Sequence, residues 1–165
     1  MTKKILLVDD ERSIRESLSK ILRVENYDVL LAENGQEAME MHRAEIIDLL
    51  VLDLNMPVQN GWATLEWLAE VHPLLPVIII TGRCNQRALA ETAGADALME
   101  KPLDVPLLLQ TVRELLNEPM ESRAQRARHR ASGSRSKRAD ERPWREMLLK
   151  SDSTPSSLPQ AKDNL

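Results

Sequence analysis

The chain has 165 residues, of which 42% are hydrophobic and 2% aromatic, so we expect an aliphatic packed core. A single cysteine, Cys84, excludes an internal disulfide framework and a zinc site made of cysteines alone. The first apolar run, residues 5–8, is too short for a signal peptide or a membrane span, which predicts a cytoplasmic protein without membrane contact.

Five short apolar segments alternate with segments of helical character over about 117 residues. In chain order they predict a strand at 4–8, a helix face at 14–22, a strand at 27–32, a helix capped by Asn34 and running to about Ala44, a strand at 48–53, a helix face at 62–71, a strand at 77–80, a short helix at 86–93, a strand at 97–100 and a helix capped by Asp104. Parallel strands need crossover helices, so this alternation predicts a parallel sheet with helices on both faces.

The charge of −4 hides a split that predicts two regions. Residues 1–116 carry 11 basic and 19 acidic side chains, whereas residues 117–150 carry 10 basic and 5 acidic side chains. We therefore expect a domain at 1–118 and a tail at 119–165 that is basic and then rich in Ser and Pro. The tail has few large apolar residues, which predicts disordered or transiently helical chain, with residues 144–149 as a candidate docking motif.

Polar side chains follow four of the five predicted strands. Asp9 and Asp10 follow the first, Asp53 ends the third, Thr81 ends the fourth and Lys101 follows the fifth. Each alone has an ordinary interpretation, such as a helix cap, a turn residue or a solvated charge. Ligands of open α/β sheets bind at the carboxyl ends of the strands, so their joint occurrence there indicates a functional site.

The residue types at this edge favour phosphoryl transfer to a carboxylate. Crowded carboxylates repel one another unless a cation binds, and Mg²⁺ prefers oxygen ligands. No two histidines lie at ligand spacing in the sequence, which argues against zinc. An aspartate can attack phosphorus, while Mg²⁺, Lys101 and the Thr81 hydroxyl would neutralise the phosphoryl oxygens.

The ensemble of motifs resembles that of response-regulator receiver domains across residues 3–117. The matching segments are Leu-Leu-Val-Asp9-Asp10-Glu11, Leu-Asp53-Leu-Asn-Met-Pro57, Gly61, Thr81-Gly82, Gly94-Ala-Asp and Lys101-Pro102. The resemblance implies a flavodoxin-like fold with strand order 2-1-3-4-5. It also implies a cis bond between Lys101 and Pro102.

The resemblance assigns a role to each matching position. It implies that Asp53 is the phosphoacceptor, Asp10 a direct Mg²⁺ ligand, Asp9 its water-bridging neighbour, the backbone carbonyl of Asn55 a further ligand, Thr81 the switch hydroxyl and Lys101 the phosphate-binding lysine. The implied partners are a histidine kinase or phosphotransfer protein and a downstream protein, with homodimerisation through the face of helix 4, strand 5 and helix 5.

One position departs from the family pattern. Receiver domains usually carry Tyr or Phe three residues before the lysine, where this chain has Leu98. We therefore expect phosphorylation to be retained and the coupling from Thr81 to the helix 4–strand 5–helix 5 face to be altered.

Three other functions are alternatives to that of a receiver. An aspartate-nucleophile phosphatase needs a second acid two residues after the nucleophile, where this chain has Asn55. A flavin-binding flavodoxin needs a Thr/Ser/Gly-rich loop after the first strand, which is absent. A DNA-binding regulator would act through the basic tail, whose plainer interpretation is a solvated extension.

His42, His72 and His129 are interpreted as solvated or packing residues.

Overall fold

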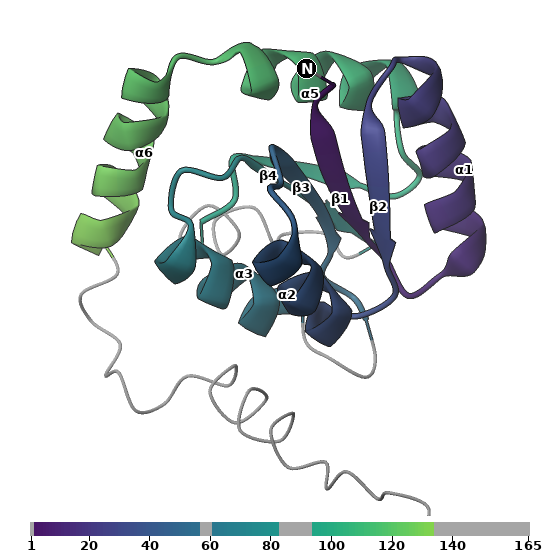
Figure 1. Ribbon diagram of the computed structural model, residues 1–165, viewed down its shortest axis with the longest axis horizontal. Helices are drawn as coiled ribbons and strands as arrows, with labels where there is room; N and C mark the ends of the chain where they lie inside the picture. Colours follow the sequence, from purple (N-terminus) through teal and green to yellow (C-terminus); the bar gives the residue numbers. More distant parts are fainter. Residues whose placement is uncertain (1, 57–60, 83–93, 134–165) are drawn as a thin grey trace, which may run out of the picture.

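A five-stranded parallel sheet forms the centre of the molecule, as Figure 1 shows for the computed structural model, which describes residues 2–56, 61–82 and 94–133. The strands are β1 (Lys4–Val8), β2 (Asp28–Ala32), β3 (Leu49–Asp53), β4 (Val77–Thr81) and β5 (Ala97–Glu100). Their order is β2-β1-β3-β4-β5, and every neighbouring pair is parallel. This confirms the predicted doubly wound, flavodoxin-like fold.

Helices cover both faces of the sheet (Figure 1). They are α1 (Arg12–Val24), α2 (Gly35–Ala44), α3 (Gly61–Val71), α5 (Val105–Asn117) and α6 (Met120–Gly133). Both predicted caps are present, because Asn34 accepts a hydrogen bond from Glu37 N at 2.9 Å and Asp104 accepts one from Leu107 N at 3.0 Å. The helix predicted at residues 86–93 and the loop residue Cys84 lie outside the described residues.

The core has two layers because successive strand residues point to opposite faces of the sheet. In β1, Ile5 and Leu7 belong to the cluster shared with α1 and α5, whereas Leu6 and Val8 belong to the cluster shared with α2 and α3. All four side chains are buried. A central strand that is buried on both faces explains the continuous apolar run in the sequence.

The two edges of the sheet carry different parts of the protein. The carboxyl ends of all five strands meet at one edge, where the predicted polar residues lie. The C-terminal ends of α2 and α3 lie at the opposite edge, because crossover helices run antiparallel to the strands. No helix within the described residues has the length and apolar character that crossing a bilayer requires.

Residues 120–133, where we expected disordered or transiently helical chain, form the helix α6. Arg123 Nη2 donates hydrogen bonds to the last-turn carbonyls of α5, Leu115 O at 2.7 Å and Leu116 O at 3.0 Å. Arg126 forms ion pairs with Asp96, whose side chain is 2% exposed, and with Glu118. Polar contacts thus anchor a helix in a segment whose few apolar residues predicted disordered or transiently helical chain. Residues 134–165 lie outside the described part of the chain.

Candidate functional site

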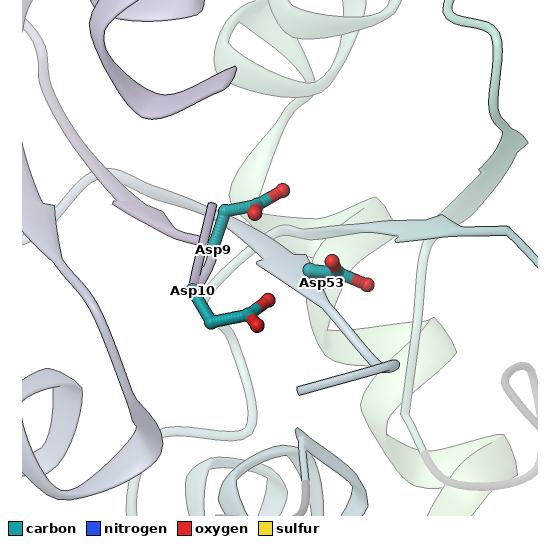
Figure 2. Close-up of side chains that lie close together, drawn as sticks. All are labelled: Asp9, Asp10 and Asp53. Carbon is teal, nitrogen blue, oxygen red and sulfur yellow. The ribbon is translucent and has the colours of Figure 1, made fainter. Parts of the chain in front are cut away.

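Three carboxylates converge at the carboxyl ends of β1 and β3 (Figure 2). Asp9 and Asp10 follow β1, and Asp53 is the last residue of β3. One oxygen from each carboxylate lies within 4.8 Å of the others. Asp9 and Asp53 are 0% and 2% exposed, whereas Asp10 is exposed. The structure therefore brings together the three acids that the sequence placed at two separate strand ends.

Lys101 links two of these acids from β5's side of the site. Its Nζ lies 2.9 Å from Asp53 Oδ2 and 3.1 Å from Asp9 Oδ2. Burial lowers the pKa of the ammonium, but the hydrogen bonds to Asp53 and Asp9 outweigh burial and hold the pKa above its ordinary value. The two carboxylates therefore stabilise the charged form of Lys101. The bond between Lys101 and Pro102 is cis, as the resemblance implied.

Asp9 is held in place by backbone and side-chain groups on both sides. Burial raises its pKa, with a further contribution from the nearby charge of Asp53. The Glu11 amide, which donates to Asp9 Oδ1 at 2.8 Å, and Lys101 both act to lower that pKa. Arg15 of α1 donates to the Asp9 carbonyl and lies 3.6 Å from Glu33 Oε2. Arg15 was not predictable as a site residue from the sequence, because no spacing rule connects a residue within a helix to a loop carbonyl six positions earlier.

Asn55 connects Asp53 with Thr81. Its backbone amide donates to Asp53 Oδ1 at 2.8 Å, and its side-chain Nδ2 lies 3.1 Å from Thr81 Oγ1. Thr81 is fully buried at the end of β4. The sequence analysis assigned only the backbone carbonyl of Asn55, so the contact of its side chain with Thr81 is an addition. A polar residue two positions after the acid was the only sequence signal for it.

Gly61 allows α3 to begin against the end of β3. A Cβ placed on Gly61 would lie 2.5 Å from the Asp53 carbonyl oxygen and 2.8 Å from Leu54 Cα. Both are backbone atoms, so they cannot move aside as a flexible side chain would. The absence of a side chain at this position thus sets how closely the helix approaches the residue that carries the central carboxylate.

Leu98 is partly buried in β5 and packs against the core cluster on the α2 and α3 face. It pairs with Ile79, two residues before Thr81 in β4. An aliphatic side chain therefore fills the position where the family usually has an aromatic ring. The altered coupling from Thr81 that we expect from Leu98 stays a prediction.

The donor set fits a small hard cation. Within the described residues, three carboxylates with converging oxygens are met by one lysine ammonium, which leaves an excess of negative charge, and all the converging side-chain ligands are oxygens. Mg²⁺ takes oxygen ligands and keeps several waters, and the exposed Asp10 leaves one side of the cluster open to water. The cluster is thus suited to a divalent cation of this class.

Comparison with known proteins supports the resemblance. The family model described as the response regulator receiver domain matches residues 5–113. The response regulator MprA of Mycobacterium ulcerans is 39% identical over 118 residues, which make up 70% of this chain and 51% of that protein. The chain thus spans about half the length of the curated relatives it matches.

Solved structures agree in fold over nearly their whole length. A CheY-like response regulator receiver domain protein from Methanospirillum hungatei has a TM-score of 0.69 and 31% identity, covering 74% of this chain and 98% of that one. The response regulator TrrA of Thermotoga maritima, crystallised with Mg²⁺ and BeF, has a TM-score of 0.65 and 32% identity, covering 69% and 99%. The chain therefore belongs to the response-regulator receiver-domain family.

Proposed function

We propose that Asp53 accepts a phosphoryl group from a histidine kinase or phosphotransfer protein and that this phosphorylation changes contacts with a downstream protein. One observation carries the proposal. The buried carboxylate of Asp53 lies 2.9 Å from the Lys101 ammonium and within reach of two further carboxylates, at the edge of the sheet where open α/β folds bind ligands.

The residues around Asp53 suit an in-line displacement at phosphorus. A carboxylate oxygen of Asp53 forms the new bond to phosphorus, and the bond from phosphorus to the donor imidazole breaks with its electron pair leaving on nitrogen. The Asn55 amide holds Oδ1 at 2.8 Å, which orients the carboxylate. Lys101 lies where it can neutralise a phosphoryl oxygen, and the Thr81 hydroxyl can donate to another.

The acidic cluster would hold Mg²⁺. Its ligands would be Asp10, Asp53 and the backbone carbonyl of Asn55, with Asp9 acting through a bound water. When bound, Mg²⁺ supplies positive charge that neutralises the carboxylates and the transferred phosphoryl group. Asp9 and Lys101 are 3.1 Å apart in this structure, and this ion pair holds the lysine close to the reacting carboxylate.

The contact between Asn55 and Thr81 supports a switching role for the hydroxyl. In this structure Thr81 Oγ1 lies 3.1 Å from Asn55 Nδ2. A phosphoryl oxygen on Asp53 would offer the hydroxyl a new acceptor on the same side of the sheet. We expect this new hydrogen bond of the Thr81 hydroxyl to move the end of β4. Because Leu98 stands where an aromatic ring is usual, we expect the movement to reach the β5 and α5 surface in a different way.

The test is a measurement of intact mass after incubation with Mg²⁺ and acetyl phosphate. We expect a gain of one phosphoryl group that requires Mg²⁺ and is absent in Asp53→Asn. Asp48→Asn is the matched control, because it removes a carboxylate just before the same strand, at the opposite edge of the sheet. A folded protein that gains no mass, or an Asp53→Asn variant that still gains it, would contradict the proposal.

The alternative of a DNA-binding regulator depends on the basic tail, most of which lies outside the described residues. Within the described side chains of α6, Arg123 and Arg126 are engaged by α5 carbonyls and by carboxylates, whereas Arg128 is exposed. Internal use of two arginines weakens this alternative. A salt-dependent DNA shift by the full chain that is lost on removing residues 118–165 would support it.

A further inference from the structure

Two histidines from different helices meet at the edge of the sheet opposite to the acidic cluster. His42 lies in the last turn of α2, and His72 follows directly after α3, where its amide donates to Leu68 O at 2.8 Å. His42 Nε2 and His72 Nδ1 are 3.1 Å apart, and the ring centroids are 5.3 Å apart. Thirty residues separate them in sequence, so the fold alone creates this pair.

The separation of the two nitrogens matches that of neighbouring ligands on one metal ion. With metal–nitrogen bonds of 2.0–2.1 Å, adjacent imidazole nitrogens are about 2.9 Å apart in square-planar geometry and about 3.3 Å apart in tetrahedral geometry. The observed 3.1 Å lies between these values. A modest turn of the two rings would convert the shared hydrogen bond into a chelate.

Replacing the hydrogen bond between the two imidazoles by a bound metal ion requires only that one proton change its position. In the neutral pair, one facing nitrogen carries the shared proton and the other accepts it. If that proton moves to the remote nitrogen of the same ring, both facing nitrogens present lone pairs and no proton need be released. Burial lowers the pKa of both imidazoles, which favours the neutral form that binds metals.

The surroundings of the pair also bear on a bound cation. The C-terminal ends of α2 and α3 converge here, and the negative ends of two helix dipoles favour positive charge. The positive charge of the Arg43 guanidinium, which lies 5.7 Å from the Trp67 ring centroid, disfavours a bound cation. Trp67 itself packs edge-on against His42, with centroids 5.4 Å apart, and so restricts the orientation of the ring. Both histidines are partly exposed, which leaves room for water to complete the coordination shell.

We propose that His42 and His72 form a second metal site, which binds one late first-row divalent ion such as Zn²⁺ or Cu²⁺ and joins the ends of α2 and α3. Imidazole nitrogen suits these ions, whereas the all-oxygen cluster at the other edge suits Mg²⁺. The two sites therefore differ in chemistry as well as in position. This inference is independent of phosphorylation at Asp53.

The test is calorimetric titration of the untagged full chain with Zn²⁺ in excess Mg²⁺, with every protein carrying Cys84→Ser so that the thiol cannot bind zinc. We expect one ion per chain. Both His42→Gln and His72→Gln should lower the affinity for Zn²⁺ by about tenfold or more. Losing a residue that only hydrogen-bonds to a metal ligand already has an effect of about this size. The matched controls, His129→Gln and Asp53→Asn, should bind as the parent protein does.

A second measurement covers the case in which a histidine variant fails to fold. In the parent protein, Zn²⁺ should shift the proton NMR resonances of two histidine rings and leave those of the third unchanged. Absence of binding by the parent protein would overturn the proposal. So would binding that persists in both folded histidine variants, or binding that Asp53→Asn abolishes.

Discussion

Replacing Gly61 by alanine should distort the site through its backbone. The added Cβ would lie 2.5 Å from the Asp53 carbonyl oxygen and 2.8 Å from Leu54 Cα, whereas ordinary contact starts at 3.4 Å. The overlaps are thus 0.9 Å and 0.6 Å, and both involve the backbone at the end of β3. Either α3 must move away from the sheet or the residue that carries the central carboxylate must shift.

The magnitude follows from two opposing effects. Inserting a methyl group into a well-packed contact typically costs about 1–3 kcal/mol. Replacing glycine also reduces the entropy of the unfolded chain, which stabilises the folded protein by about 0.4–1 kcal/mol. We therefore expect Gly61→Ala to lower the free energy of unfolding by about 1–2 kcal/mol. Because the shorter of the two contacts is with Asp53 itself, phosphorylation from acetyl phosphate should also slow.

The assay is urea unfolding followed by circular dichroism, together with the rate of mass gain. Gly82→Ala is the matched control, since among the described residues its Cβ would meet nothing closer than Asn55 Nδ2 at 3.7 Å, an ordinary contact beside the same site. It should be as stable as the parent protein, or more stable by the about 0.4–1 kcal/mol that the lower entropy of its unfolded chain contributes. Equal unfolding midpoints and equal phosphorylation rates for the two variants would refute the argument from close approach.

Two further predictions concern ion pairs away from the cluster. Burial raises the pKa of Asp48, but hydrogen bonds that include one from Lys3 outweigh burial and hold the pKa below its ordinary value. The ionised Asp48 side chain therefore stabilises the folded protein at pH values above the unfolded-state pKa. This stabilisation is lost as the pH falls through the folded-state pKa. Asp48→Asn should therefore be less stable than the parent protein at pH 7, by less than about 1 kcal/mol, and the difference in urea midpoints should shrink as the pH falls below the ordinary aspartate value of about 3.9. A difference that is constant with pH would count against this account. Arg126→Ala should speed amide hydrogen exchange across residues 120–133 and lower the free energy of unfolding by about 1–3 kcal/mol, because the buried carboxylate of Asp96 loses a charged partner. The exposed Arg128→Ala should change neither, and equal exchange in both variants would show that the ion pair does not anchor α6.

Much of the fold was predictable because local pattern and global architecture agree in this chain. Continuous apolar runs such as residues 49–52 predict strands buried on both faces, and the structure buries every residue of β3. Asn34 and Asp104 mark helix starts because their side chains accept amide protons of the first turn. The site residues could be located for the same reason, since parallel strands bring their carboxyl ends to one edge of the sheet.

Composition failed where polar contacts replaced apolar burial. Residues 120–133 contain few apolar side chains, which predicts disordered or transiently helical chain. In the structure α6 is anchored by Arg123 on the α5 carbonyls and by Arg126 on Asp96, a residue 30 positions earlier. An arginine in a sequence does not disclose which buried carboxylate it will meet.

The sequence by itself determined the order of the elements, the residue types at the strand ends and hence the family. Only the tertiary structure decided which groups touch: Lys101 with Asp53 and Asp9, and His42 with His72. The physical reason is that periodicity and capping act over a few residues along the chain. Contacts between distant residues depend on strand register and helix packing, which place side-chain atoms to within an ångström and are set by the core as a whole.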